Sequence, residues 1–247
     1  MYSNFQVDFL TKAKTSSTGV GLLEVSTLPF ETCQPVRRPR AYHGQRHFPN
    51  LYFFEKMSKL ILCESRNERA AVMLLDFNPI IDVVATQPFR LHYKLKQRSY
   101  VHYPDIYTRD RYGRVCIIDV KALDFVDDAD FQRQAEATKI ACDQIGWGYE
   151  IQTEPHPTFF SNVSWLSGYR SLREEKAGYA DSLVDNAHLT EHSIGSLIRS
   201  VDGPAYLVRP ILFWLLWRQV LNVDLYLPMT DSTPILTEAR GGHSAER

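Results

Sequence analysis

Two aspartates and a lysine stand out in the stretch HYPDIYTRDRYGRVCIIDVKA, which covers residues 102–122. Asp119 and Lys121 interrupt a run that is otherwise apolar, from residue 115 to residue 122. A charged side chain is costly to bury unless it is paired or bound to a metal ion. This run therefore either ends at the surface or uses its charged residues for binding or catalysis.

The same stretch has the pattern of a β-hairpin that brings Asp105 and Asp119 together. A turn centred near Tyr112, with Gly113 tolerating a positive φ, places Asp105 opposite Asp119 or one residue away. Directly opposed residues have Cβ atoms about 5 Å apart, so the carboxylates repel each other unless a cation lies between them. Lys121 lies two residues beyond Asp119 and is expected on the same face.

A helix predicted from about residue 55 to residue 77 supplies a third acid. Glu68 lies on an inward stripe at helical spacing. The apolar members of this stripe are Ile61, Val72 and Leu75. Glu64 lies one turn earlier and close to the stripe, and either glutamate could instead be a solvated residue at its margin. We expect Glu68 to be the third acid, with Glu64 as the alternative.

Two aspartates, a glutamate and a lysine suit the hydrolysis of a phosphodiester. Carboxylate oxygens bind Mg²⁺, for which Mn²⁺ can substitute, and the bound Mg²⁺ keeps waters and also takes a phosphate oxygen. Such an ion activates water, and a lysine can orient that water or neutralise the phosphate. An acid, then PD, then DxK across a hairpin is the residue order of PD-(D/E)XK nucleases. We therefore predict Glu68, Asp105 and Asp119 as metal ligands and, together with Lys121, as catalytic residues.

Other polar residues near these positions have two interpretations each. Gln87 either approaches the site from a neighbouring strand as an auxiliary residue or is an amide at a strand edge beside a proline. His102 falls on the opposite face from Asp105 by strand parity unless Pro104 introduces a bulge, and we expect a structural role for it. A basic cluster early in the chain is a candidate for contact with DNA phosphates, although most charge runs are simply solvated. Its arginines are Arg37, Arg38, Arg40 and Arg46.

Composition limits the class of protein without selecting a function. The chain has 247 residues, 44% of them apolar, and a net charge of −1, so its overall charge does not indicate nucleic-acid binding. Its four cysteines lack CxxC spacing and are expected to be reduced thiols. We find no signal-peptide pattern, and the longest apolar run is far shorter than the ~20 residues of a membrane span. We expect a cytoplasmic protein without membrane contact.

The order of predicted elements indicates an α/β protein with four parts. Residues 1–50 are predicted to be an irregular arm, and residues 51–174 an α/β domain of helix, antiparallel strands, helix, strand and helix. The helix before Gly146 is expected to bury Phe131, Ala135, Thr138, Cys142 and Ile145. Residues 175–236 are expected to form a small second domain that docks a partner or DNA, and residues 237–247 a disordered tail.

A longer set of motifs resembles one family. The chain reads YHGQRHFPNLYFFEKMSKLILCESRNERAAVMLLDFNPIIDVVATQPFRLHY, then YPDIY, then DVKA. This order resembles the TnsA-like endonuclease subunit of heteromeric DNA transposases, which has a GQ lead-in, an ESxLER-like helix, an LDF-P turn, a QP strand, a PD strand and an [E/D/Q]xK strand. Here the helix reads ESRNER, with Asn67 where an apolar residue is usual.

The resemblance implies a fold, an activity and partners. The fold is a restriction-endonuclease-like mixed sheet flanked by helices, followed by a small helical or winged-helix domain. The implied activity is hydrolysis of the non-transferred (5′) strand at transposon ends, with Glu68, Asp105, Asp119 and Lys121 at the catalytic positions. The implied partners are double-stranded DNA, a DDE-type transposase subunit and an ATPase regulator. Two alternatives stay open: a stand-alone restriction or repair nuclease, and a non-catalytic DNA-binding or scaffold subunit.

Overall fold

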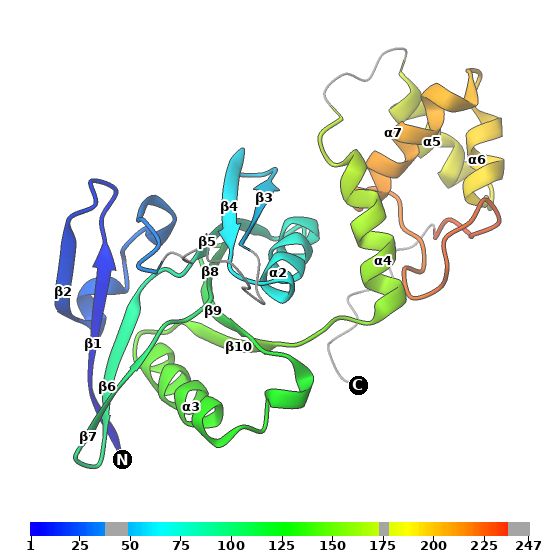
Figure 1. Ribbon diagram of the computed structural model, residues 1–247. Helices are drawn as coiled ribbons and strands as arrows, with labels where there is room; N and C mark the ends of the chain where they lie inside the picture. Colours follow the sequence, from blue (N-terminus) through cyan, green and yellow to red (C-terminus); the bar gives the residue numbers. More distant parts are fainter. Residues whose placement is uncertain (38–48, 173–177, 237–247) are drawn as a thin grey trace. The chain divides into compact units, whose positions relative to one another are not determined.

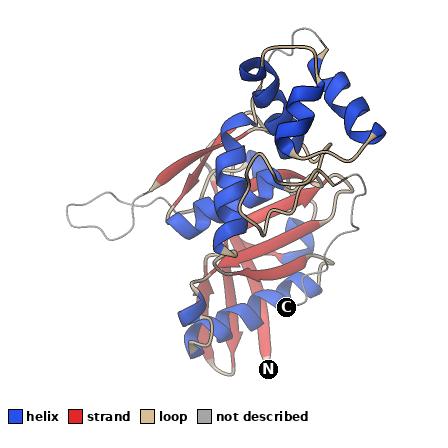
Figure 2. Cartoon of the chain, turned by 90° about the vertical axis from the view of Figure 1, so that its right-hand side faces the viewer, coloured by secondary structure: helices blue, strands red, loops and turns tan. Residues whose placement is uncertain are grey.

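The computed structural model of the protein describes residues 1–37, 49–172 and 178–236. The chain divides into two compact units, Met1–Glu154 and Pro155–Arg247, which we call unit 1 and unit 2 (Figure 1). Unit 1 contains strands and helices, whereas the elements assigned in the described part of unit 2 are helical (Figure 2). The protein is therefore mixed α/β, as predicted. Arg38, Arg40, Arg46 and the tail predicted for residues 237–247 lie outside the described residues.

The central sheet of unit 1 has the strand order β10-β9-β8-β5. Its strands are Ile81–Thr86 (β5), Ile106–Asp110 (β8), Val115–Val120 (β9) and Gly148–Gln152 (β10). Strand β8 pairs antiparallel with β5 and β9, whereas β10 runs parallel to β9. A parallel pair needs a crossover connection, and helix α3 (Ala129–Asp143) provides it while packing against β10. This helix has Asp128 as its N-cap and buries most of the apolar stripe predicted for it.

Residues 2–21 are not an irregular arm, as the sequence pattern predicted, but two strands of a second sheet. This N-terminal sheet has the order β2-β1-β6-β7. Its strands are Tyr2–Leu10 (β1), Ser16–Gly21 (β2), Arg90–Leu95 (β6) and Arg98–His102 (β7). Only Val7 and Phe9 of β1 are fully buried, and a bulge between Ser3 and Gln6 interrupts the alternation. The strand is therefore held mainly by pairing with β6, which local periodicity does not reveal.

Two short helical segments follow β2 and complete the core beneath this sheet. They are α1 (Leu22–Val25) and the 3-10 helix η1 (Phe30–Thr32). The buried Phe30 ring contacts the rings of Phe9, Phe89 and Tyr107, with centroids 5.2–5.7 Å apart. Phe30 thereby packs residues from both sheets into one core.

The helix predicted for residues 55–77 begins later than expected. Asn50–Phe54 (β3) and Lys59–Cys63 (β4) form an antiparallel ribbon, and helix α2 covers Arg66–Phe77. Ile61 therefore lies on a strand and not on the helical stripe, because short apolar runs fit either structure. The helix ends at Asn78, as predicted.

The chain passes between the two sheets at two prolines. One predicted strand is divided at Gln87–Pro88 into β5 and β6, and the next is divided at Tyr103–Pro104 into β7 and β8. Proline cannot donate to a strand ladder, and at both places the chain leaves one sheet and enters the other. The Gln87 N–H donates a hydrogen bond to the Asp105 carbonyl oxygen at 2.8 Å. The β6–β7 hairpin thus begins and ends at neighbouring points of the central sheet.

Unit 2 begins earlier than the predicted boundary near residue 175. Its helices are α4 (Pro157–Leu166), η3 (Ser167–Tyr169), α5 (Tyr179–Leu189), α6 (Ile194–Ser200) and α7 (Ala205–Trp217). Helix α4 belongs with this unit because Trp165 packs on Phe213 of α7, with ring centroids 4.3 Å apart. The Asn162 amide also donates hydrogen bonds to the carbonyl oxygens of Leu225 and Leu227, both at 2.8 Å.

The last described segment, residues 218–236, forms loops and turns and carries two isolated bridges, Ser193 with Pro234 and Asn222 with Leu236. Among the described residues, no helix has the length and apolar character needed to cross a membrane. All four cysteines are free thiols, as expected.

Candidate active site

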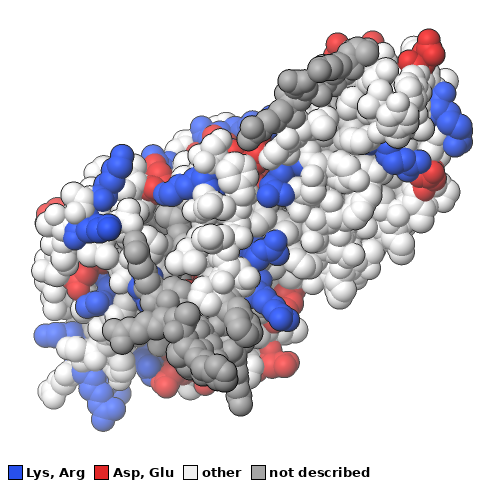
Figure 3. All heavy atoms as spheres, turned by 45° about the horizontal axis from the view of Figure 1, so that its top comes forward, with Lys and Arg blue, Asp and Glu red and all other residues white. Residues whose placement is uncertain are grey.

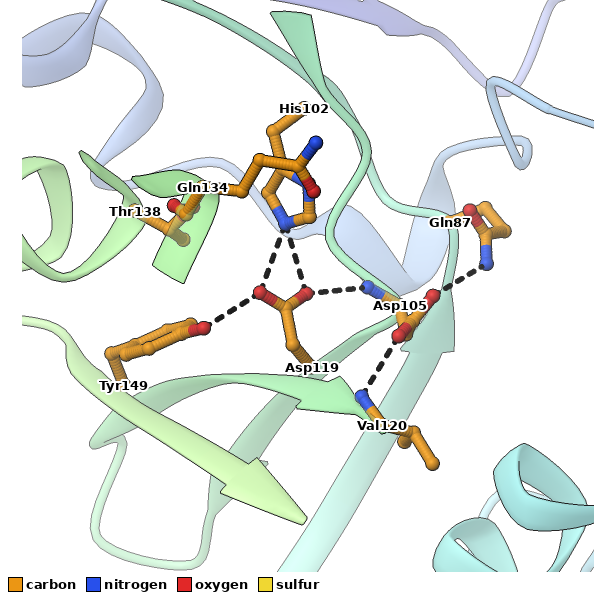
Figure 4. Close-up of polar contacts among 8 residues, drawn as sticks. All are labelled: Gln87, His102, Asp105, Asp119, Val120, Gln134, Thr138 and Tyr149. Carbon is orange, nitrogen blue, oxygen red and sulfur yellow. Dashed lines mark hydrogen bonds and ion pairs between the residues drawn. The ribbon is translucent and has the colours of Figure 1, made fainter. Parts of the chain in front are cut away.

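Asp105 and Asp119 lie beside each other at the end of the β8–β9 hairpin that is opposite its turn. The turn lies at Gly113, whose φ is 82°, and the register pairs Ile106 with Ile118, so Asp105 faces Asp119 one position farther along. The Asp105 N–H donates to Asp119 Oδ1 at 3.3 Å (Figure 4). The Val120 N–H donates to Asp105 Oδ2 at 2.8 Å. The facing arrangement predicted from the hairpin pattern is confirmed.

Asp105 is the more accessible of the two acids. The residue as a whole is of intermediate exposure, whereas Asp119 is 1% exposed, but the carboxyl group of Asp105 is itself largely buried. Burial among protein atoms raises the pKa of Asp105 to about 7, and the negative charges of Asp119 and Glu68 add to this effect. A carboxylate in this environment is stabilised by a nearby cation.

Asp119 is held by two side chains from outside its hairpin. His102 Nε2 lies 3.0 Å from Oδ1 and 2.9 Å from Oδ2 and donates to the carboxylate. The Tyr149 hydroxyl of β10 donates to Oδ2 at 2.7 Å (Figure 4). Burial and the Asp119 charge raise the pKa of Tyr149, which keeps its hydroxyl protonated as a donor. Together with the Asp105 N–H, these donors occupy the acceptor positions of the carboxylate.

The sequence pattern did not predict the contacts of His102 and Tyr149 with Asp119. The parity argument placed His102 on the wrong face because Tyr103–Pro104 turns the chain from one sheet into the other. Pro104 was the available signal, since prolines in strands mark bulges and edges. Tyr149 gave no signal, because β10 reaches β9 only through the α3 crossover.

Gln87 contacts Asp105 through both its backbone and its side chain. Its Nε2 lies 3.4 Å from Asp105 Oδ1, and its own carbonyl oxygen accepts a hydrogen bond from the Val36 N–H at 3.0 Å. Its φ is 49°, a conformation that costs free energy for a residue other than glycine and that clusters at functional sites. Its Oε1 is buried and has no hydrogen-bond partner among the described residues. The structure thus places Gln87 beside the predicted site.

Glu68 occupies the first turn of α2 and is 6% exposed. Its backbone N–H bonds to Ser65 Oγ at 3.1 Å, and its Oε2 accepts a hydrogen bond from the Glu64 N–H at 2.9 Å. This arrangement resembles a capping box. Burial raises the pKa of Glu68, and the Glu64 charge raises it further. Glu68 is therefore inward-facing, as predicted.

Glu64 has a different environment. Its Oε2 pairs with Arg37 at 3.4 Å, and its Oε1 is buried without a hydrogen-bond partner in the described part of the chain. Among the causes of the raised Asp105 pKa is the charge of Glu68. Glu68 is therefore the glutamate that the electrostatics of the site connect to Asp105.

We expect the two glutamates to respond differently to replacement by glutamine. Glu68→Gln keeps an oxygen that accepts the Glu64 N–H but loses the charge, so cleavage of DNA should fall about a hundredfold or more. Glu64→Gln should reduce cleavage only a few fold. Cleavage of labelled DNA with Mg²⁺ measures both, and circular dichroism checks that α2 remains folded. The opposite ranking would assign the third acid to Glu64.

Lys121 lies beyond the end of β9, two residues after Asp119. Its ammonium group lies over the Phe131 ring of α3, 4.8 Å from the centroid. The backbone N–H of Lys121 donates a hydrogen bond to the Gln152 carbonyl oxygen. No ion pair joins Lys121 to Asp105 or Asp119 in the structure described. Its catalytic role stays a prediction.

The carboxylate and amide oxygens of the site are of the chemical type that Mg²⁺ binds, although they do not form a complete set of metal ligands. Among the described residues, no group of three or more His, Cys, Asp or Glu side chains is arranged to hold a metal ion. Mg²⁺ commonly needs only one or two carboxylates, because water and substrate phosphate fill its remaining positions. Asp105 offers a carboxylate whose repulsion by Asp119 and Glu68 a cation would relieve, and Gln87, whose Nε2 faces this carboxylate, has a buried Oε1 without a hydrogen-bond partner among the described residues. A search of family models and a search of curated proteins each found no match for this chain.

Proposed function

We propose that the protein is a Mg²⁺-dependent DNA endonuclease of the PD-(D/E)XK type, with a restriction-endonuclease-like central sheet in unit 1. The observation that carries the proposal is the pairing of Asp105 with Asp119 across the β8–β9 hairpin, with the pKa of Asp105 raised by both Asp119 and Glu68. Acidic residues whose pKa is strongly raised by burial and by neighbouring charges are typical of functional sites.

The residues of the site divide the work as follows. Asp105 and Glu68 would hold Mg²⁺, and Asp119, kept in place by His102 and Tyr149, orients the Asp105 backbone by accepting a hydrogen bond from the Asp105 N–H. When bound, Mg²⁺ lowers the pKa of water and stabilises negative charge on the phosphate. For Asp119 to become a ligand, one of its present donors must move away. Lys121 moves from the Phe131 ring to neutralise the phosphate when DNA is bound.

The motif order supports a more specific proposal. We propose that the chain is the TnsA-like subunit of a heteromeric transposase and that it cuts the non-transferred strand at each element end. The partner would be a DDE-type transposase subunit that cuts and joins the other strand. Unit 2 would serve as the winged-helix-like domain that contacts a partner or an ATPase regulator. It offers helices and, at residues 222–236, a looped segment that takes part in two isolated bridges.

Lys121→Ala tests this assignment through the products of transposition. Folding and assembly should be nearly intact, since a cation over an aromatic ring contributes only about 1 kcal/mol. Strand transfer by the partner should continue, but the element would stay attached to its donor through the uncut strands. Products would then shift from simple insertions to donor–target fusions, which sequencing of insertion products distinguishes. Simple insertions at unchanged frequency would refute the assignment.

One observation favours a non-catalytic subunit as the second candidate. The Lys121 ammonium contacts Phe131 and neither aspartate. A scaffold of the same fold would bind DNA ends without cutting them. Unchanged products from Lys121→Ala and from Glu68→Gln together would select this alternative.

A further inference from the structure

The β6–β7 hairpin is strongly basic in a chain whose net charge is −1. Residues 90–102 contain four Lys or Arg residues and no Asp or Glu. The four are Arg90, Lys94, Lys96 and Arg98. Lys94, Lys96 and Arg98 are exposed, and Arg90 is half-buried.

Strand pairing within the N-terminal sheet shows which of these basic side chains lie next to an acidic residue. Lys94 lies between Ser99 of β7 and Ser3 of β1, so neither cross-strand neighbour is an acid. The acid on this face is Asp8, whose Oδ2 lies 3.5 Å from Arg90 and 2.8 Å from His92 Nε2. Within the described residues, Lys94 and Lys96 have no ion pair. Lys94 is on an inner strand, so protecting a sheet edge does not explain its charge.

A second set of contacts connects this face to the candidate active site. The Arg90 guanidinium lies over the Tyr103 ring at 5.3 Å from the centroid, and that of Arg37 lies 6.0 Å from the same centroid. Arg37 in turn pairs with Glu64, two residues before α2. Basic groups therefore follow one another from Arg37 beside Glu64, along β6, to the hairpin tip.

The tip itself carries a local conformation that does not suit its residue. Lys96 has a φ of 56°, at a two-residue turn between the paired Leu95 and Arg98. Asn or Gly is preferred at such positions because a side chain is strained there. A strained lysine, exposed at the end of a basic strand, indicates a role other than stability.

Unit 2 offers less positive charge than this hairpin. Residues 155–247 contain eight Lys or Arg and ten Asp or Glu. On the face drawn in Figure 3, Lys and Arg side chains lie among Asp and Glu over unit 1, whereas the surface of unit 2 is mostly uncharged. A polyanion is therefore attracted to the β6–β7 hairpin more than to unit 2.

We propose that a basic surface made of Arg90 and Lys94 on β6, Lys96 at the hairpin tip and the neighbouring Arg37 contacts the phosphate backbone of double-stranded DNA beside the cutting site. This inference rests on the proposed function and names the surface that holds its substrate. From Arg98 to Asp105 the chain reaches at most about 23 Å at roughly 3.3 Å per residue. This length is less than one turn of duplex DNA, which is about 34 Å. The tip therefore contacts phosphates within one helical turn of the bond that is cut.

The test is DNA binding by the full chain and two matched variants. The hairpin variant is Lys94→Gln with Lys96→Gln, and the control is Lys59→Gln with Lys139→Gln, which removes two exposed lysines from β4 and α3. Fluorescence anisotropy with a labelled duplex of arbitrary sequence, roughly three helical turns long, gives Kd at several salt concentrations. The hairpin variant should bind about tenfold more weakly at physiological salt, and its slope of log K against log salt should fall by about 2. The control should keep the wild-type slope.

A single substitution separates binding from folding. Lys96→Gly removes the strain, so the thermal midpoint should stay the same or rise, while DNA affinity falls. Equal slopes for the hairpin and control variants, or no binding of duplex DNA by the wild type, would overturn the inference. Hairpin-dependent binding without any cleavage by the wild type would instead uphold this surface and refute the proposed nuclease activity.

Discussion

Replacement of Asp105 by asparagine is expected to abolish DNA cleavage and, at the same time, to stabilise the folded protein above neutral pH. Cleavage should fall at least about a hundredfold, because the carboxylate that we propose as a Mg²⁺ ligand is lost. The fold should gain stability because asparagine has no charge to be repelled by Asp119 and Glu68. One hydrogen bond, from Val120 or Gln87, is weakened, which costs about 1 kcal/mol.

The pH dependence of this gain follows from the pKa of Asp105. The folded protein has a pKa of about 7 at this carboxyl, above the ordinary value of 3.8, so it binds the proton more tightly than the unfolded chain does. The stability linked to that proton is fully present below about pH 4 and is lost as the pH rises to about 7. Asp105→Asn should therefore be more stable than the wild type at pH 8, by roughly 1–3 kcal/mol, and not at pH 5.

Chemical denaturation of both proteins at the two pH values measures this difference. Mg²⁺ or Mn²⁺ should raise the stability of the wild type at pH 8 and leave Asp105→Asn unchanged, because only the wild type has the carboxylate to bind it. A stability difference that is the same at both pH values would contradict the electrostatic account. Equal stabilisation of both proteins by the metal would exclude Asp105 as a ligand.

Compared with Tyr149→Phe and His92→Ala, His102→Ala should lower the free energy of unfolding most, by about 3 kcal/mol. Asp119 is 1% exposed, so the carboxylate cannot replace its lost donor with bulk water. Tyr149→Phe removes one hydroxyl donor and should cost less, about 2 kcal/mol. Both variants should also cut DNA more slowly, since Asp119 then holds the Asp105 backbone less firmly.

The protein contains a matched control for this prediction. His92 makes a contact of the same kind with Asp8, at 2.8 Å, but its side chain is 33% exposed, against 9% for His102. His92→Ala should therefore cost less than about 1 kcal/mol. Urea denaturation of both alanine variants gives the comparison. Similar losses in the two would show that burial of Asp119 does not determine the energy of its contact.

The features that the sequence predicted correctly are those set by local spacing. The turn at Gly113 and the two-residue period of strands suffice to place Asp105 opposite Asp119. The end of helix α2 at residue 77, with Asn78 as its C-cap, is likewise decided by neighbouring residues. Such features need no knowledge of distant parts of the chain.

The features that were missed depend on distant segments. Strand β1 is stabilised by pairing with β6, more than 80 residues later in the chain. His102 approaches Asp119 only because the chain changes sheets at Pro104, which breaks the parity rule. The predicted start of helix α2 near residue 55 was wrong because β3 and β4 pair with each other. A short apolar run does not reveal a partner strand.

The meeting of Gln87 and Asp105 has a consequence for how the molecule can vary. The segment between these residues leaves the central sheet and returns to it at a single hydrogen bond of 2.8 Å. An excursion whose two ends coincide can change in length or charge at its tip without shifting the register of the strands that carry it. The β6–β7 tip can thus be exchanged and, on the proposed function, grafting a different turn between Leu95 and Arg98 should change the affinity for DNA while Asp105 and Asp119 keep their positions.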